Sequence, residues 1–308
     1  AMPVIAGEKP ANERFPGADN TYSIEAMMQD GKALQAGTSH YLGTHFAEAQ
    51  NIQFQNQDGK LTYCHTTSWG VSTRLIGGVI MSHGDDDGLR MPPKIAPRQI
   101  VIVPMLRDKP EDAELKSYCA ELEAELKAQG IRVLVDLKPV KSAEKRWTWV
   151  RRGAPVIVEI GGRDAAGGNV TFMRRDRLRD GDKVVSHTTR AEFVGDARTL
   201  LENIQAGLFA EAKARLDQNI ASNIHTFADL QSYYGSSAGE DDDAEFKGWA
   251  GVMWAKPEGA ALEAVAERLK ALKLTIRNAP LEQPPLEGRK CLFTGEPAKE
   301  YVLIGRAY

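Results

Sequence analysis

Apolar and polar residues follow different patterns in three successive stretches of the chain. In residues 1–97, strand-like runs at 22–28 and 60–66 each lie beside an Asp-Gly pair, at residues 30–31 and 58–59. An Asp-Gly pair between strand-forming runs is typical of a tight β-hairpin. The first stretch is therefore predicted to form an antiparallel sheet.

The second stretch has continuous apolar runs that alternate with amphipathic segments. The runs IVIVPM, IRVLVDL and PVIVEIG begin at residues 100, 131 and 155 and read as buried strands. Apolar residues with the spacing of one helix face precede Gly130: Leu115, Cys119, Leu122 and Leu126. A second helix is expected near residues 143–152, and NVTFMRRD is expected to return as an antiparallel strand after a hairpin loop, GGRDAAGGN. This pattern predicts an α/β domain with a mixed sheet.

The third stretch begins with a long amphipathic helix at about residues 196–219. Residues 235–243, GSSAGEDDD, have linker composition. Strand, helix and strand patterns follow at 249–254, 258–272, 274–276, 290–293 and 301–304. We therefore expect three parts: an antiparallel α+β part at 1–97, an α/β domain at 98–203 and a small α+β domain at 204–308.

Composition narrows the class of protein. The 308 residues are 42% hydrophobic and 26% charged, as in folded globular chains, and no run approaches the roughly 20 apolar residues of a membrane span. The start lacks the pattern of a signal peptide, so we expect a cytoplasmic protein with no membrane partner. Three widely spaced cysteines argue against a disulfide framework and against a four-thiolate zinc site.

The formal net charge of −3 conceals an uneven distribution of charge. Residues 138–190 hold 13 Lys and Arg against 6 Asp and Glu, whereas residues 191–247 hold 4 against 11. The basic segment is either an ordinary solvated face or a surface that binds RNA phosphates, and charge alone leaves both open.

The segment SWGVSTRLIGGVIMSHGDDDGLRMPP, at 68–93, carries the strongest candidate site. Arg74 lies where a strand gives way to a helix that runs to about His83, so its guanidinium and the free N–H groups of the first turn can face one anion. Such a site would hold a phosphate. The alternative is a tight contact between helix and sheet with a surface arginine.

The segment at 29–43, QDGKALQAGTSHYLG, has small polar residues suited to the wall of a ligand site. Strand alternation places Gln35 on one face and Thr38 and His40 on the other, unless a bulge at Gly37 changes their direction. A lone histidine is more often a hydrogen-bonded core residue, and the spacing of His40 from His45 does not suit a shared metal.

Three adjacent aspartates at 85–87 offer oxygen ligands for a hard cation or form a solvated loop. The chain contains no Walker A loop, GxGxxG, GxSxG or HExxH sequence. The sequence therefore gives no support to a hydrolase or a dehydrogenase.

Several long strings resemble one family along the whole chain. They are ERFPGADNTYSIEAMMQDGKALQAGTSHYLGTHF, TSWGVSTRLIGGVIMSHGDDDGLRMPPKIAPRQIVIVP, GAPVIVEIGGRD with FMRRD, and CLFTGEPAKEYVLIGRAY. With these strings the chain resembles the C-terminal portion of class II prolyl-tRNA synthetases of the archaeal and eukaryote-like type. The resemblance implies the second half of a class II antiparallel catalytic domain, an α/β anticodon-binding domain and a small α+β C-terminal domain.

The resemblance also implies an activity and its site residues. In this family, ATP and Mg²⁺ serve to join L-proline to AMP, and the prolyl group then passes to tRNA(Pro). Residues 70–74 and the following helix resemble class II motif 3, whose arginine, here Arg74, binds the ATP phosphates. The remaining site residues are implied by position: Gln35 and Thr38 for the adenylate, and Phe15, His40 and Ser72 for proline.

The resemblance favours RNA binding by the basic segment. The residues it implies near the anticodon stem-loop are Arg152, Arg163, Asp164, Arg174 and Arg175. Guanidinium groups and acidic side chains there can stack on and hydrogen-bond splayed bases.

Two departures from the family pattern modify these expectations. Class II motifs 1 and 2, which precede the opening segment in relatives and supply the homodimer interface and a further arginine, are not found in these 308 residues. We therefore expect residues 1–308 alone to be inactive, although the intact enzyme is expected to be a homodimer. Relatives often carry four zinc-binding cysteines in the terminal domain, whereas only Cys291 is present here, with Thr294 at a second position, so zinc is not expected.

One alternative function remains from the sequence. A non-catalytic tRNA-binding module would keep the anticodon domain and a remnant of the nucleotide site. A further N-terminal segment with motifs 1 and 2 in the native protein, detected by its intact mass, distinguishes a ligase from this module. A third interpretation, a generic α/β protein with no RNA partner, requires that tRNA binding be absent even at low salt.

Overall fold

The computed structural model describes residues 1–178, 185–235 and 247–308, which form two compact units. One unit contains residues 2–78 and 213–308, and the other contains residue 1 and residues 79–212. The predicted linker at 235–243 lies almost wholly outside the described residues. The division into parts at 1–97, 98–203 and 204–308 stays a prediction, because the units group the chain differently.

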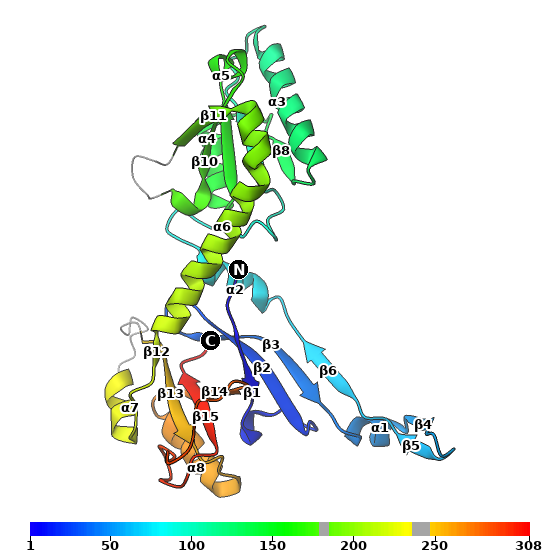
Figure 1. Ribbon diagram of the computed structural model, residues 1–308, viewed down its shortest axis with the longest axis vertical. Coiled ribbons are helices and arrows are strands. Elements are labelled where there is room, and N and C mark those ends of the chain that lie inside the picture. The colour runs from blue at the N-terminus through cyan, green and yellow to red at the C-terminus, as the bar shows by residue number, and fades with distance from the viewer. Residues whose placement is uncertain (179–184, 236–246) are drawn as a thin grey trace. The chain divides into compact units, whose positions relative to one another are not determined.

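The first unit is built on an eight-stranded sheet that joins both ends of the chain (Figure 1). Its strands, in spatial order, are β12 (Ile220–Ala221), β13 (Trp249–Trp254), β15 (Glu300–Gly305), β14 (Thr275–Pro280), β1 (Ile5–Glu8), β2 (Asn20–Met27), β3 (Ala33–Tyr41) and β6 (Thr67–Gly70). All neighbouring pairs are antiparallel except β12 with β13. Strands from the first and third stretches of the sequence thus form one sheet, through the pairing of β1 with β14.

Shorter elements complete this unit. They are η1 (Ala11–Glu13), α1 (His45–Gln50), β4 (Gln53–Gln55), β5 (Leu61–Tyr63), α7 (Phe227–Tyr234) and α8 (Gly259–Lys270). Both hairpins predicted from Asp-Gly pairs are confirmed, since one turn joins β2 to β3 and the other joins β4 to β5. The run at 290–293 forms only a single bridge between Lys290 and Pro297, not the predicted strand.

The second unit contains the five-stranded sheet of the α/β domain. Its strands, in spatial order, are β11 (Val185–Thr189), β10 (Asn169–Arg174), β9 (Val156–Ile160), β7 (Ile100–Pro104) and β8 (Val133–Val135). The strands β8, β7 and β9 are parallel, and β10 and β11 are antiparallel additions. The predicted mixed sheet is therefore confirmed.

Helices cover both faces of this sheet, as strand alternation requires. They are α3 (Asp112–Ala128), α4 (Ser142–Arg151), α5 (Gly162–Ala166), η2 (Arg175–Arg177) and α6 (Arg190–Gln218), of which residues 190–212 belong to this unit. One face packs in a core with α3 and α6, through Ile100 and Ile102, and the other packs with α4, through Val101 and Val103. The predicted hairpin loop at 161–169 contains the short helix α5, because the Asp164 carboxylate accepts the backbone N–H of Gly161.

The helix α2 (Arg74–His83) begins and ends where the sequence predicts. Its residues 74–78 belong to the first unit, which also carries the strand β6 that leads into it. This places the start of α2 beside the strands that hold the other candidate residues.

Candidate functional site

A β-bulge determines which candidate residues share a face of the first sheet. Along β2 and β3, Ile24 is opposite Gly37, whereas Glu25 is opposite Gln35, so Ala36 is an extra residue in β3. Residues directly opposite in antiparallel strands project from the same face. The bulge therefore moves Gln35 to the face that carries Thr38 and His40.

His40 is held by the neighbouring strand. Its Nδ1 lies 3.1 Å from the hydroxyl oxygen of Thr21, which also accepts the backbone N–H of Phe15 at 3.1 Å. The Thr21 hydroxyl and His40 Nδ1 share one hydrogen bond, whose donor depends on the histidine tautomer. The rings of Phe15 and His40 lie 4.9 Å apart, so two of the predicted proline-binding residues are adjacent. Sequence reasoning missed Thr21, although the pairing of β2 with β3 places it opposite His40.

The turn from β6 into α2 brings the predicted phosphate-binding residue to this face. The Ser72 hydroxyl accepts the backbone N–H of Arg74 at 3.3 Å, and Arg74 Nη1 donates to the backbone carbonyl of Gln35 at 3.3 Å. Gly70 lies opposite Thr38, and a Cβ at residue 70 would lie 3.2 Å from the Thr38 hydroxyl. Glycine thus leaves space beside the Thr38 hydroxyl, and the Arg74 side chain is exposed.

The opposite face of this part of the sheet, formed by the residues that alternate with the site residues, is apolar. A cavity of about 410 Å³ is lined by Tyr22, Ile24, Trp69 and Val71, together with residues 37–39 of β3. Trp69 is 76% exposed and Val71 is 74% exposed, and Trp69 lies on the edge strand β6. Exposed apolar patches of this kind mark surfaces that other protein segments cover.

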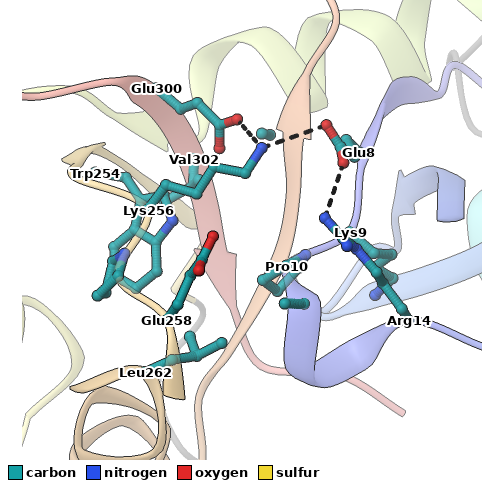
Figure 2. Close-up of a pocket in the computed structure, with 13 residues that line it drawn as sticks. Glu8, Lys9, Pro10, Arg14, Trp254, Lys256, Glu258, Leu262, Glu300 and Val302 are labelled. Carbon is teal, nitrogen blue, oxygen red and sulfur yellow. Dashed lines mark hydrogen bonds and ion pairs between the residues drawn. The ribbon is translucent and has the colours of Figure 1, made fainter. Parts of the chain in front are cut away.

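A second cavity, of about 290 Å³, lies between residues 8–14 and the loop after β13 (Figure 2). Glu8 links two cations there: Arg14 Nη2 lies 3.3 Å from Glu8 Oε1, and Lys256 Nζ lies 3.5 Å from Glu8 Oε2. Lys256 also pairs with Glu300. This alternating row of charges joins β1 to the C-terminal strands, and none of the predicted site residues lines the cavity.

In the second unit, the predicted RNA-binding residues have different environments. Arg152 and Arg163 are exposed, and the Arg152 guanidinium lies 5.3 Å from the ring of Trp149. Asp164 caps α5, and Arg174 forms two hydrogen bonds with Asp176, at 3.0 and 2.7 Å. These residues remain candidates for contact with RNA.

Arg175 is placed differently, because its side chain is only 1% exposed. Its guanidinium donates to the backbone carbonyls of Val150 and Gly88 and to both oxygens of Asp85. An arginine with these internal partners stabilises the fold, so we leave it out of the proposed RNA surface.

The aspartate loop at 85–87 is explained by the same contact. Asp85 pairs with Arg175 and also accepts the backbone N–H of Asp87 at 3.0 Å. Gly88 and Gly153 allow this loop to approach the end of α4, because a Cβ at either residue would lie about 2.5 Å from a backbone oxygen, of Arg151 or Leu89. Asp85 therefore serves as an internal ion-pair partner.

This ion pair predicts a dependence of stability on pH. The hydrogen bond from Arg175 lowers the pKa of Asp85 below its ordinary value, against the opposing effect of burial. A carboxyl group whose pKa is lower in the folded protein stabilises the fold at pH values above its pKa in the unfolded chain, near 4. This stabilisation is lost as the pH falls through the pKa of the folded state. We expect Asp85→Asn to reduce the free energy of unfolding by roughly 2 kcal/mol at pH 7 and by much less at pH 3. Urea unfolding at both pH values tests this, and an equal loss at both would contradict it.

Metal ligands do not gather in the described parts of the chain. Residues 1–178, 185–235 and 247–308 contain no group of three or more His, Cys, Asp or Glu side chains placed to hold a metal ion. Around the buried Cys291, an aromatic cluster packs the C-terminal segment: Phe293 lies 5.7 Å from Trp254 and 6.0 Å from Phe227. The expected lack of zinc stays a prediction. Among the described helices, none is long and apolar enough to cross a membrane.

Two family models match the chain. Residues 99–196 match the model described as "Anticodon binding domain", and residues 243–308 match "Prolyl-tRNA synthetase, C-terminal". The chain is similar to the C-terminal portion of prolyl-tRNA synthetases. These matches confirm the predicted resemblance to prolyl-tRNA synthetases, and together with the two sheets they confirm the predicted fold class.

Individual relatives agree with the family models. A proline–tRNA ligase of Sphingopyxis alaskensis is 60% identical over 315 residues, covering 100% of this chain and 58% of the relative. One from Sphingomonas elodea is 58% identical, covering 100% and 60%. The prolyl-tRNA synthetase of Cryptosporidium parvum, solved with halofuginone and AMPPNP, has a TM-score of 0.88 at 32% identity, covering 100% of this chain and 60% of that one. The chain thus spans about 60% of the length of these relatives.

Proposed function

We propose that the chain is part of an enzyme that ligates L-proline to tRNA(Pro) with ATP, through a prolyl-adenylate. The observation that carries this proposal is the cluster on one sheet face, where the bulge in β3 aligns Gln35 with Thr38 and His40 and where Arg74 contacts the Gln35 carbonyl. The ligase names of the relatives and the AMPPNP bound to the Cryptosporidium enzyme support it.

The proposed roles follow from where each group lies. Arg74, exposed at the start of α2, binds the ATP phosphates together with the first helical N–H groups. Gln35 and Thr38 contact the adenylate. Phe15 and His40 form one wall for the proline ring, and Ser72, in the turn before α2, also contacts proline.

The proposed chemistry requires no covalent enzyme intermediate. A carboxylate oxygen of proline attacks the α-phosphorus of ATP, and pyrophosphate leaves. A terminal ribose hydroxyl of tRNA(Pro) then attacks the prolyl carbonyl, and AMP leaves. The residues of this chain align the reactants and stabilise the phosphate charge. Mg²⁺ would accompany ATP as a counter-ion of its phosphates.

Further features are proposed on the same basis. We assign the enzyme to the archaeal and eukaryote-like type, supported by the strings around residues 13–46 and 67–104 and by the match to the Cryptosporidium structure. We also propose that the intact enzyme is a homodimer and that the apolar surface at Trp69 and Val71 is covered by additional polypeptide in the intact enzyme. The segment around Cys291 is proposed to hold together without zinc, through Phe293 and its aromatic neighbours.

Proline-dependent exchange of radiolabelled pyrophosphate into ATP tests the proposed function. We expect exchange from an intact protein that carries this sequence, and only background exchange from residues 1–308 alone. Aminoacylation of tRNA(Pro) should follow with the intact protein. Binding of tRNA(Pro) without any exchange by the intact protein would contradict the ligase proposal and support the non-catalytic module, which the ligase relatives do not favour.

A further inference from the structure

Helix α4 is fixed to its domain by polar contacts on its inner side. Lys145 Nζ donates to the backbone carbonyl of Asp136 at 2.9 Å, and Trp149 Nε1 donates to the Asp136 carboxylate at 2.8 Å. Lys145, Trp149 and Asp136 are all buried. The residues on the outer side of α4 are therefore presented from a rigid support.

The outer side of α4 carries an exposed tryptophan. Trp147 is 46% exposed, and helical spacing places it on one face with Glu144 and Arg151. The segment that leads into the helix also exposes apolar side chains, at Leu137 and Val140. A tryptophan has only two side-chain torsions, so an indole exposed on a fixed helix offers a flat apolar surface with little conformational entropy to lose on binding.

Basic residues surround this indole in the sequence. The exposed cations of residues 137–152 are Lys138, Lys141, Arg151 and Arg152, against the single exposed carboxylate of Glu144. The remaining basic residues of the helix have other roles, because Lys145 is buried and Arg146 pairs with Glu159 at 3.1 Å. Residues 137–152 thus combine an exposed indole on α4 with a local excess of exposed positive charge.

We propose that Trp147 is a stacking platform for an unpaired base of an RNA loop, with the neighbouring cations bound to the phosphates on either side. Aromatic side chains beside cations suit single-stranded RNA, whose bases stack on the ring while its phosphates meet the charges. The excess of exposed cations over exposed carboxylates in residues 137–152 favours a negatively charged partner. The proposal rests on the proposed function, since it names a contact for the tRNA that this domain would bind.

The first test measures binding of a tRNA(Pro) transcript and of its anticodon stem-loop to the intact protein. We expect Trp147→Ala to weaken binding roughly 5- to 100-fold, as the loss of one base–aromatic stack does, without changing the salt dependence. Trp147→Phe should retain most of the affinity. Arg151→Gln should instead reduce the slope of log affinity against log salt by about 1.

A matched control removes an exposed aromatic elsewhere in the same unit. Phe209 on α6 is 43% exposed, and Phe209→Ala should leave binding unchanged. Circular dichroism and urea unfolding of each variant establish that Trp147→Ala is folded.

A second test identifies the stack itself. A series of stem-loops is prepared, each with a different loop nucleotide made abasic. One of them should bind the unmodified protein more weakly than the complete stem-loop does, yet bind Trp147→Ala as well as the complete stem-loop does. RNA should also quench tryptophan fluorescence in the unmodified protein, and this quenching should be smaller in Trp147→Phe.

If the unmodified protein binds tRNA(Pro) but Trp147→Ala binds equally well, the stacking proposal is overturned and the proposed function stands. If the unmodified protein fails to bind tRNA(Pro) even at low salt, the proposed function itself fails.

Discussion

Replacing Arg74 with alanine is expected to lower proline-dependent pyrophosphate exchange by the intact enzyme about 10²- to 10³-fold, the usual cost of removing one oriented donor from a developing phosphate charge. The side chain is exposed, and among the described residues its one hydrogen-bond partner is the Gln35 carbonyl, at 3.3 Å. Its loss should therefore change the free energy of unfolding by less than about 0.5 kcal/mol. Steady-state exchange kinetics with ATP and proline varied separately measure the effect.

Two further variants show whether the loss of activity is specific to the guanidinium of Arg74. Arg74→Lys keeps the charge but loses the planar fork of donors, so an intermediate loss of activity is expected. Arg98 is also exposed, and it donates to the backbone carbonyl of Pro97 at 3.0 Å, so Arg98→Ala is a matched control that should retain full activity. A similar loss in both alanine variants, or full activity in Arg74→Ala, would remove Arg74 from the phosphate site.

Local patterns in the sequence were sufficient for the elements around the site. The strand and helix on either side of Arg74 follow from periodicity, and α2 begins and ends at the predicted residues. The direction of Gln35 did not follow, because alternation assumes an unbroken register and Ala36 interrupts it. A glycine within a strand signals a possible bulge, but only the partner strand determines where the extra residue lies.

Long-range contacts explain the other differences between sequence and structure. Arg175 counts toward a basic segment in the sequence, yet its Asp85 partner is 90 residues away and makes it an internal residue. The pairing of β1 with β14 likewise joins residues near both ends of the chain, which no local pattern indicates. Charge counts and periodicity describe segments separately, whereas these roles depend on which segments meet.

The largest expected effect on stability comes from an ion pair that crosses this shared sheet. Arg277 Nε and Nη2 donate to Glu25 Oε2 at 3.1 and 2.8 Å, and the Glu25 side chain is fully buried. Arg277→Met leaves that carboxylate with Lys9 as its remaining cation, at 3.5 Å. Breaking one side of a buried pair costs about 3–5 kcal/mol, so the urea midpoint of the unit that holds this sheet should fall by a corresponding amount.

A compensating variant separates the charge from the packing. The double variant Arg277→Met with Glu25→Gln removes the uncompensated carboxylate but keeps nearly the same shape, so it should recover most of the loss, whereas Glu25→Gln alone should be markedly destabilised. Lys9 keeps a partner in each variant, because its Nζ also lies 2.9 Å from Glu13. A double variant no more stable than Arg277→Met would show that the lost stability came from packing rather than from the buried charge. Recovery would mean that the contact between β2 and β14 tolerates the loss of both charges but not a lone buried carboxylate, so the Arg277 side chain is needed there to neutralise Glu25.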